Sequence, residues 1–127
     1  MNKKILIVDD EVHIRALLEQ ALEDLEDEGV EIFLAQEGEE GLQVAREEKP
    51  DLMFLDIMMP KKNGYEVCEE IKGDPELKDI YIIMLTAKGQ TADRARGEEV
   101  KANEYITKPF NPDEILQKAS DILGVQI

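Results

Sequence analysis

The sequence predicts an α/β protein, with a five-stranded parallel sheet covered by helices on both faces. Five short apolar runs alternate with five amphipathic stretches along the chain. The runs are apolar throughout, which is typical of strands buried on both faces of a sheet, and strict alternation with helices favours parallel strands. The 127 residues match the usual size of one domain, and 43% of them are hydrophobic, enough to build a core.

The first part of the chain contains two strand–helix pairs. Residues 5–8 are apolar and largely β-branched and stop at two aspartates, which predicts a buried strand. Between 14 and 25 the apolar residues recur at helical spacing, so we expect one amphipathic helix that ends near Gly29. Residues 30–35 predict the second strand. Residues 39–48 predict the second helix, which a proline two positions later terminates.

The same pattern continues through the middle of the chain. Residues 52–55 predict the third strand, and a helix over 65–71 ends at the Gly-Asp-Pro of 73–75. Residues 80–85 are the most apolar run and predict the fourth strand. A polar helix is expected over 91–101, although it contains a glycine, which destabilises a helix by about 1 kcal/mol.

The last pair begins with a strand predicted over 104–107. Asn111 as a cap, Pro112 at the first helical position and two acidic residues after it predict the start of the final helix. We find no linker, repeat or low-complexity segment, so residues 1–127 are expected to form a single domain. If this sequence is complete, nothing remains for an output domain.

Composition excludes several classes of function. Fifteen Lys and Arg stand against thirty Asp and Glu, giving a net charge of −15 and a pI near 4.4. This argues against direct binding to nucleic acid or to an anionic membrane, both of which need a basic face. The first ten residues, with an apolar run of four before two aspartates, are not expected to form a signal peptide, and no apolar run reaches the ~18 residues that a membrane helix needs. Cys68 is the single cysteine, so no internal disulfide is possible, and we expect a cytoplasmic protein.

Polar residues follow four of the predicted strands. Asp9 and Asp10 follow the first, Asp56 the third, Thr86 the fourth and Lys108 the fifth. The carboxyl ends of parallel strands meet at one edge of the sheet, where ligands bind at the point of reversal of the strand order. In a flavodoxin-like (βα)5 three-layer sandwich of order 2-1-3-4-5, the first and third strands are neighbours. The three aspartates are then expected to lie together.

This set of side chains suits phosphoryl transfer. Three crowded carboxylates repel one another, and a cation between them relieves the repulsion. Oxygen ligands with open positions suit Mg²⁺, which also binds phosphate oxygens. Lys108 would neutralise charge on the transferred group, Thr86 would donate to one of its oxygens, and Asp56 would attack in line.

Four fragments carry a resemblance to a known family. They are ILIVDDE at 5–11, PDLMFLDIMMPKKNG at 50–64, MLTAKG at 84–89 and ANEYITKPF at 102–110. Each contains the end of a predicted strand. Together, and in this order, they resemble the receiver domains of two-component response regulators over essentially the whole chain.

The resemblance implies a role for each residue of the acidic pocket. It implies that Asp56 is the phosphoacceptor and that Asp10 binds Mg²⁺ directly. Asp9 would hold the ion mainly through water, and the backbone carbonyl of Met58 would complete the ligands of the protein. Lys108 would stabilise the phosphoryl group.

The resemblance also implies a conformational switch. Thr86 would move toward the phosphoryl group while Tyr105 turns inward. Lys108 would precede a cis peptide bond to the following proline. Met58 and Lys88, each two residues past a pocket residue, would tune hydrolysis of the acyl phosphate.

The expected function is therefore that of a phosphorylation-dependent signalling switch and not of an enzyme. A sensor histidine kinase or a histidine phosphotransfer protein would donate the phosphoryl group to Asp56 in a Mg²⁺-dependent reaction. An unidentified downstream protein would read the changed conformation, as for stand-alone chemotaxis-type receivers. No direct contact with nucleic acid or with a membrane is expected.

Three alternatives remain open. The chain could be the receiver fragment of a DNA-binding transcriptional regulator. A phosphatase of the haloacid dehalogenase type would need an aspartate where Met58 stands. An FMN carrier of the flavodoxin type would need a Ser/Thr/Gly-rich loop after the first strand, where Asp9, Asp10 and Glu11 would repel a phosphate.

Overall fold

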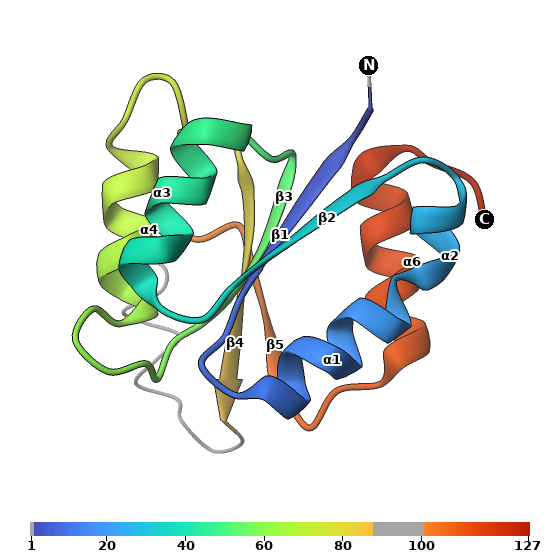
Figure 1. The fold of residues 1–127 in the computed structure, drawn as a ribbon, viewed down its shortest axis with the longest axis horizontal. Helices are drawn as coiled ribbons and strands as arrows, with labels where there is room; N and C mark the ends of the chain where they lie inside the picture. The colour runs from blue at the N-terminus through green and yellow to red at the C-terminus, as the bar shows by residue number, and fades with distance from the viewer. Residues whose placement is uncertain (1, 88–100) are drawn as a thin grey trace.

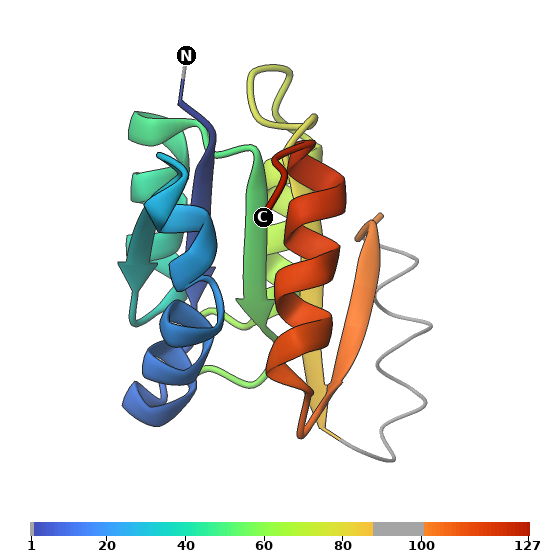
Figure 2. The same cartoon turned by 90° about the vertical axis from the view of Figure 1, so that its right-hand side faces the viewer.

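A computed structural model describes residues 2–87 and 101–127. Within those two ranges, five strands form one parallel sheet of order β2-β1-β3-β4-β5 (Figures 1 and 2). The strands are β1 (Lys4–Val8), β2 (Glu31–Ala35), β3 (Leu52–Asp56), β4 (Tyr81–Ala87) and β5 (Glu104–Lys108). The sheet order confirms the predicted flavodoxin-like fold.

Helices cover both faces of the sheet. The helices of the described ranges are α1 (Val12–Ala21), α2 (Glu23–Asp27), α3 (Gly38–Glu48), α4 (Gly64–Lys72) and α6 (Pro112–Leu123). In Figure 1, α1, α2 and α6 lie on one side of the sheet and α3 and α4 on the other. The helix expected over 91–101 falls almost entirely outside the described residues. In the described ranges, no helix is both long and apolar enough to cross a membrane.

The predicted helix over 14–25 is divided into α1 and α2 at Leu22. The Leu22 N–H donates to the carbonyls of Leu18 and Glu19, and the Leu25 N–H donates to Leu22 over three residues instead of four. The backbone therefore forms one tighter turn of the 3₁₀ type at this point, with Leu22 at φ −97° and ψ 6°. Leu22 and Leu25 both stay buried, so the break preserves the apolar face on which the prediction was based.

Buried side chains fill the space on both sides of the sheet. Alternate strand residues point to opposite faces, so β1 sends Leu6 and Val8 toward α3 and α4, and Ile5 and Ile7 toward α1 and α6. Cys68 lies in the layer of α4, where burial raises the pKa of its thiol to about 11 and keeps the thiol protonated.

Side chains cap the starts of two helices, and the cap at Asn111 confirms the predicted start of the final helix. At α4, the Asn63 side chain accepts from the Glu66 N–H while the Glu66 carboxylate accepts from the Asn63 N–H, both at 3.0 Å. At α6, the Asn111 side chain accepts from the Asp113 N–H at 2.8 Å, and Pro112 occupies the first turn. These caps fix where the loops after β3 and β5 end.

Candidate functional site

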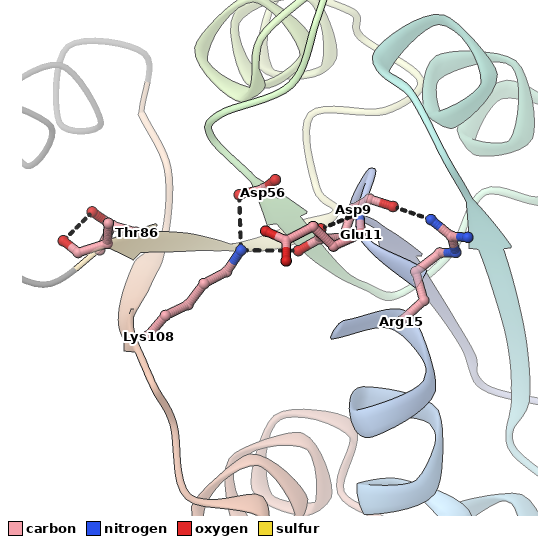
Figure 3. A network of polar contacts seen from close by, with 7 residues as sticks. Asp9, Glu11, Arg15, Asp56, Thr86 and Lys108 are labelled. Carbon is pink, nitrogen blue, oxygen red and sulfur yellow. Dashed lines mark hydrogen bonds and ion pairs between the residues drawn. The ribbon is translucent and has the colours of Figure 1, made fainter. Parts of the chain in front are cut away.

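An acidic pocket lies at the carboxyl ends of β1, β3 and β5. Carboxylate oxygens of Asp9, Asp10 and Asp56 lie within 4.8 Å of one another. Figure 3 shows the Lys108 ammonium reaching between two of them, 3.1 Å from Asp9 Oδ2 and 3.2 Å from Asp56 Oδ1. Lys108 precedes a cis peptide bond to Pro109, as the resemblance implies.

The alternation of side chains along the strands explains why three of these groups meet. Asp9, Asp56 and Lys108 each come two residues after a side chain that is buried in the layer of α1 and α6. Those three core residues are Ile7, Phe54 and Ile106. Side chains two positions apart on a strand point to the same face, so all three polar groups point toward the same helical layer.

Burial and mutual repulsion control the charges in the pocket. Asp9 is fully buried, Asp56 is 3% exposed and Asp10 is exposed. Burial, followed by the charge of Asp9, raises the pKa of Asp56 to about 7, against the opposing effect of Lys108. Burial also raises the pKa of Asp9. Burial works to lower the pKa of Lys108, but the charges of Asp56 and Asp9 outweigh it and raise this pKa.

Backbone hydrogen bonds fix the buried Asp9. Its N–H donates to the Ala35 carbonyl at 3.2 Å, which continues the ladder between β1 and β2. Its Oδ1 accepts from the Glu11 N–H at 2.9 Å, and its carbonyl accepts from Arg15 Nη1 at 2.7 Å. Arg15 was not among the predicted site residues. Its position in the first turn of α1 was the available signal, since helical side chains point back toward the N-terminus.

Gly64 holds the loop after β3 against the strand that carries Asp56. The Gly64 N–H donates to the Ile57 carbonyl at 2.9 Å. A Cβ added at Gly64 would lie 2.4 Å from the Asp56 carbonyl oxygen and 2.9 Å from the Ile57 Cα, so only glycine allows this approach. In the same loop, Met58, two residues after Asp56, is 64% exposed.

Thr86 was expected to join the carboxylates, but the structure directs it elsewhere. It lies within β4, two residues after Met84, whose partner on β5 is Tyr105. Met84 and Tyr105 belong to the layer of α3 and α4, so Thr86 and Tyr105 share that face of the sheet. The Thr86 hydroxyl donates to the Ala87 carbonyl at 3.3 Å, and Figure 3 shows Thr86 set apart from the acidic cluster. The residues of the proposed switch pair therefore share the face covered by α3 and α4, whereas Asp9, Asp56 and Lys108 point toward the layer of α1 and α6.

The donor atoms of the pocket fit a small divalent cation. Three carboxylates offer only oxygen, the element that Mg²⁺ prefers, and the Lys108 ammonium balances one of the three charges when all three are ionised. Asp10 is exposed and so leaves the pocket accessible from solvent.

The sheet order and the acidic pocket together define a flavodoxin-like α/β protein with a candidate metal site, and comparison with known proteins identifies its family. The response regulator receiver domain profile matches residues 5–120. The chain belongs to this family, whose members are domains of two-component response regulators. They act as signalling switches rather than enzymes and generally use Mg²⁺ at an acidic pocket.

Similar proteins include both long and short chains. "Probable transcriptional regulator ycf27" of Cyanophora paradoxa is 46% identical over 96% of this chain and 48% of its own length. "Alkaline phosphatase synthesis transcriptional regulatory protein PhoP" of Bacillus subtilis is 45% identical over 97% of this chain and 49% of its own. A crystal structure described as a response regulator of Chloroflexus aurantiacus has a TM-score of 0.86 and 35% identity, covering 98% of this chain and 99% of that one. The chain thus spans about half the length of the curated relatives it matches.

Proposed function

We propose that Asp56 accepts a phosphoryl group from a phosphohistidine of a sensor histidine kinase or a phosphotransfer protein. One observation carries the proposal. A nearly buried carboxylate stands at the end of β3, 3.2 Å from a lysine ammonium and within 4.8 Å of two further carboxylates. This combines a nucleophile with a cation that can offset the charge of the incoming group.

The transfer forms one bond and breaks another. An Asp56 carboxylate oxygen attacks phosphorus, and the imidazole of the donor leaves with the electrons of the P–N bond and takes up a proton. Asp56 must be ionised to attack, and Lys108 favours its ionised form. After transfer, the Lys108 ammonium is placed to balance charge on the phosphoryl oxygens.

We assign the metal site to the carboxylates of Asp9, Asp10 and Asp56 and the backbone carbonyl of Met58. Magnesium bound there supplies positive charge against the phosphoryl oxygens. The Asp9 carboxylate is already held by the Glu11 N–H and the Lys108 ammonium, so it contributes with little loss of side-chain entropy. Asp10, which is exposed, faces the solvent from which the ion and the donor arrive.

The readout is assigned to the face that carries Thr86 and Tyr105. Tyr105 is half-buried and lines a groove along β5 and the start of α6, with Pro109 and Phe110 among its neighbours. Movement of the Thr86 hydroxyl toward a phosphoryl group on Asp56 would change the packing beside Tyr105. A downstream protein that binds this groove would then distinguish the two states.

The test is intact mass spectrometry after incubation with acetyl phosphate, with and without Mg²⁺. We expect one added phosphoryl group on the wild type, dependent on Mg²⁺, and none on Asp56→Asn. Asp121→Asn, at an exposed position of α6, is the matched control and should be modified like the wild type. A folded wild type that takes up no phosphoryl group would contradict the proposal.

A second candidate is a receiver that controls a DNA-binding domain on the same polypeptide. It is favoured by the relatives named as transcriptional regulators, of which the chain matches about half. An immunoblot of an extract of cells that carry the gene, made with an antibody raised against this chain, would distinguish the two candidates by the mass of the detected protein. A species near 14.4 kDa supports the independent receiver. One of about twice that mass supports the regulator.

A further inference from the structure

We propose that Arg15 is a positioning residue for the metal-binding turn between β1 and α1. Its guanidinium Nη1 donates to the Asp9 carbonyl oxygen at 2.7 Å (Figure 3). Arg15 contacts the backbone of this turn and leaves the Asp9 and Asp10 carboxylates to the ion. The inference rests on the proposed metal site and adds a residue outside its ligand set.

The contact matters because of which peptide group it holds. The Asp9 carbonyl belongs to the planar peptide unit that joins Asp9 to Asp10. The orientation of this unit sets ψ of Asp9 and φ of Asp10, and with them the direction of both carboxylates. A donor fixed on this oxygen therefore orients two proposed metal ligands through one hydrogen bond.

Local capping does little to hold this turn. The side chain of Glu11, the residue at the N-cap of α1, makes no capping hydrogen bond, and the first turn of α1 has no acidic residue. The turn is held instead by Asp9, whose Oδ1 accepts from the Glu11 N–H at 2.9 Å. Arg15 adds the bond on the carbonyl, and its own N–H donates to the Glu11 carbonyl at 3.1 Å as part of α1.

Positioning and simple electrostatics predict opposite results, which makes the proposal testable. A positive charge near three carboxylates repels a cation, so removing Arg15 would strengthen Mg²⁺ binding if charge alone mattered. If Arg15 orients the ligands, its removal weakens Mg²⁺ binding instead, since loss of an outer partner lowers metal affinity by about tenfold or more. Lys108 differs because it contacts the carboxylates themselves.

The experiment measures Mg²⁺ affinity by calorimetric titration of the full chain, with the unfolding temperature in EDTA as a separate readout of folding. We expect Arg15→Met, which keeps the apolar stem but loses every donor, to weaken Mg²⁺ binding about tenfold. Arg15→Lys, which keeps a donor and the charge, should recover most of the affinity. Arg46→Met is the matched control: Arg46 is exposed on α3, 3.9 Å from Glu70, and its loss should change the affinity by less than about twofold.

Each outcome decides the proposal. Unchanged or tighter Mg²⁺ binding by Arg15→Met would overturn the positioning role while leaving the metal site intact. Wild type without measurable Mg²⁺ affinity would overturn both the site and the inference. Should Arg15→Met fail to fold, Arg15→Gln carries the same test, because its amide is too short to replace the guanidinium and its affinity should also fall.

Discussion

The Lys108 ammonium lies 3.2 Å from Asp56 Oδ1, although 52 positions separate the two residues in the sequence. The contact joins the last residues of β5 and β3, two strands separated in the sheet by β4. It places a cation next to the carboxylate that we assign as the phosphoacceptor.

Removing the ammonium should slow phosphorylation of Asp56. We expect Lys108→Met to react with acetyl phosphate at least about tenfold more slowly, because a preorganised charge next to the reacting oxygen is lost. The pKa of Asp56 should also rise further, since Lys108 opposes its elevation. Lys118→Met is the control: Lys118 pairs with Glu104 at 2.5 Å, outside the pocket. The time course of intact mass measures both variants, and equal rates for Lys108→Met and the wild type would refute this role.

The elevated pKa of Asp56 makes the metal-free protein less stable as the pH rises. The pKa of Asp56 in the folded protein, about 7, lies above the ordinary aspartate value of 3.8, so folding takes up a proton at a pH between these two values. Relative to Asp56→Asn, the free energy of unfolding of the wild type should fall between about pH 4 and pH 7. Above that range the variant should be more stable by on the order of 1–3 kcal/mol. Urea unfolding in EDTA at pH 4 and pH 8 measures this difference, and a pH-independent gap between the two proteins would contradict it.

Magnesium should stabilise the folded protein through the exposed Asp10. At a hundred times the dissociation constant, an ion that binds only the folded state adds about 2.7 kcal/mol. Asp10→Asn should fold, since the side chain is exposed, but its unfolding temperature should respond little to Mg²⁺. Asp24→Asn, at an exposed position of α2, should respond like the wild type. A full response from Asp10→Asn would remove Asp10 from the ligand set.

Gly64→Ala should affect both stability and phosphorylation. The new Cβ would lie 2.4 Å from the Asp56 carbonyl oxygen, so the loop or the end of β3 must shift. We expect a loss of about 2 kcal/mol in urea unfolding and a slower reaction with acetyl phosphate. At Gly73 the nearest atom to an added Cβ is 3.2 Å away. Gly73→Ala should therefore lose less stability in urea unfolding and react with acetyl phosphate at the rate of the wild type. Equal losses for both variants would show that the contact with Asp56 is unimportant.

Met58 should make the aspartyl phosphate long-lived. Met58 is 64% exposed, two residues after Asp56, and its thioether cannot orient an attacking water as an amide can. We therefore expect Met58→Asn to lose its phosphoryl group faster than the wild type. The release of inorganic phosphate over time measures this rate. Identical half-lives would refute this expectation. Lys88, the other residue expected to tune hydrolysis, lies outside the described residues.

Much of the fold could be predicted because its signals are local. Apolar runs, helical spacing and the cap at Asn111 depend on neighbours a few residues away, and the described residues carry the five predicted strands and the cap. The alternation of strands and helices then favours a parallel sheet, whose carboxyl ends bring distant aspartates to one edge. The break at Leu22 was missed because it depends on how the helix turns to keep Leu25 buried.

The sequence alone determined which residue types stand at the strand ends, and so the proximity of Asp9, Asp10 and Asp56. Tertiary structure decided which face each side chain takes. Thr86 lies inside β4, on the face opposite Asp56, and this depends on where the strand ends and on its register with β3 and β5. The Arg15 contact with the Asp9 carbonyl and the raised pKa of Asp56 likewise arise from packing. Both depend on distances between elements and on exclusion of water, which no local pattern encodes.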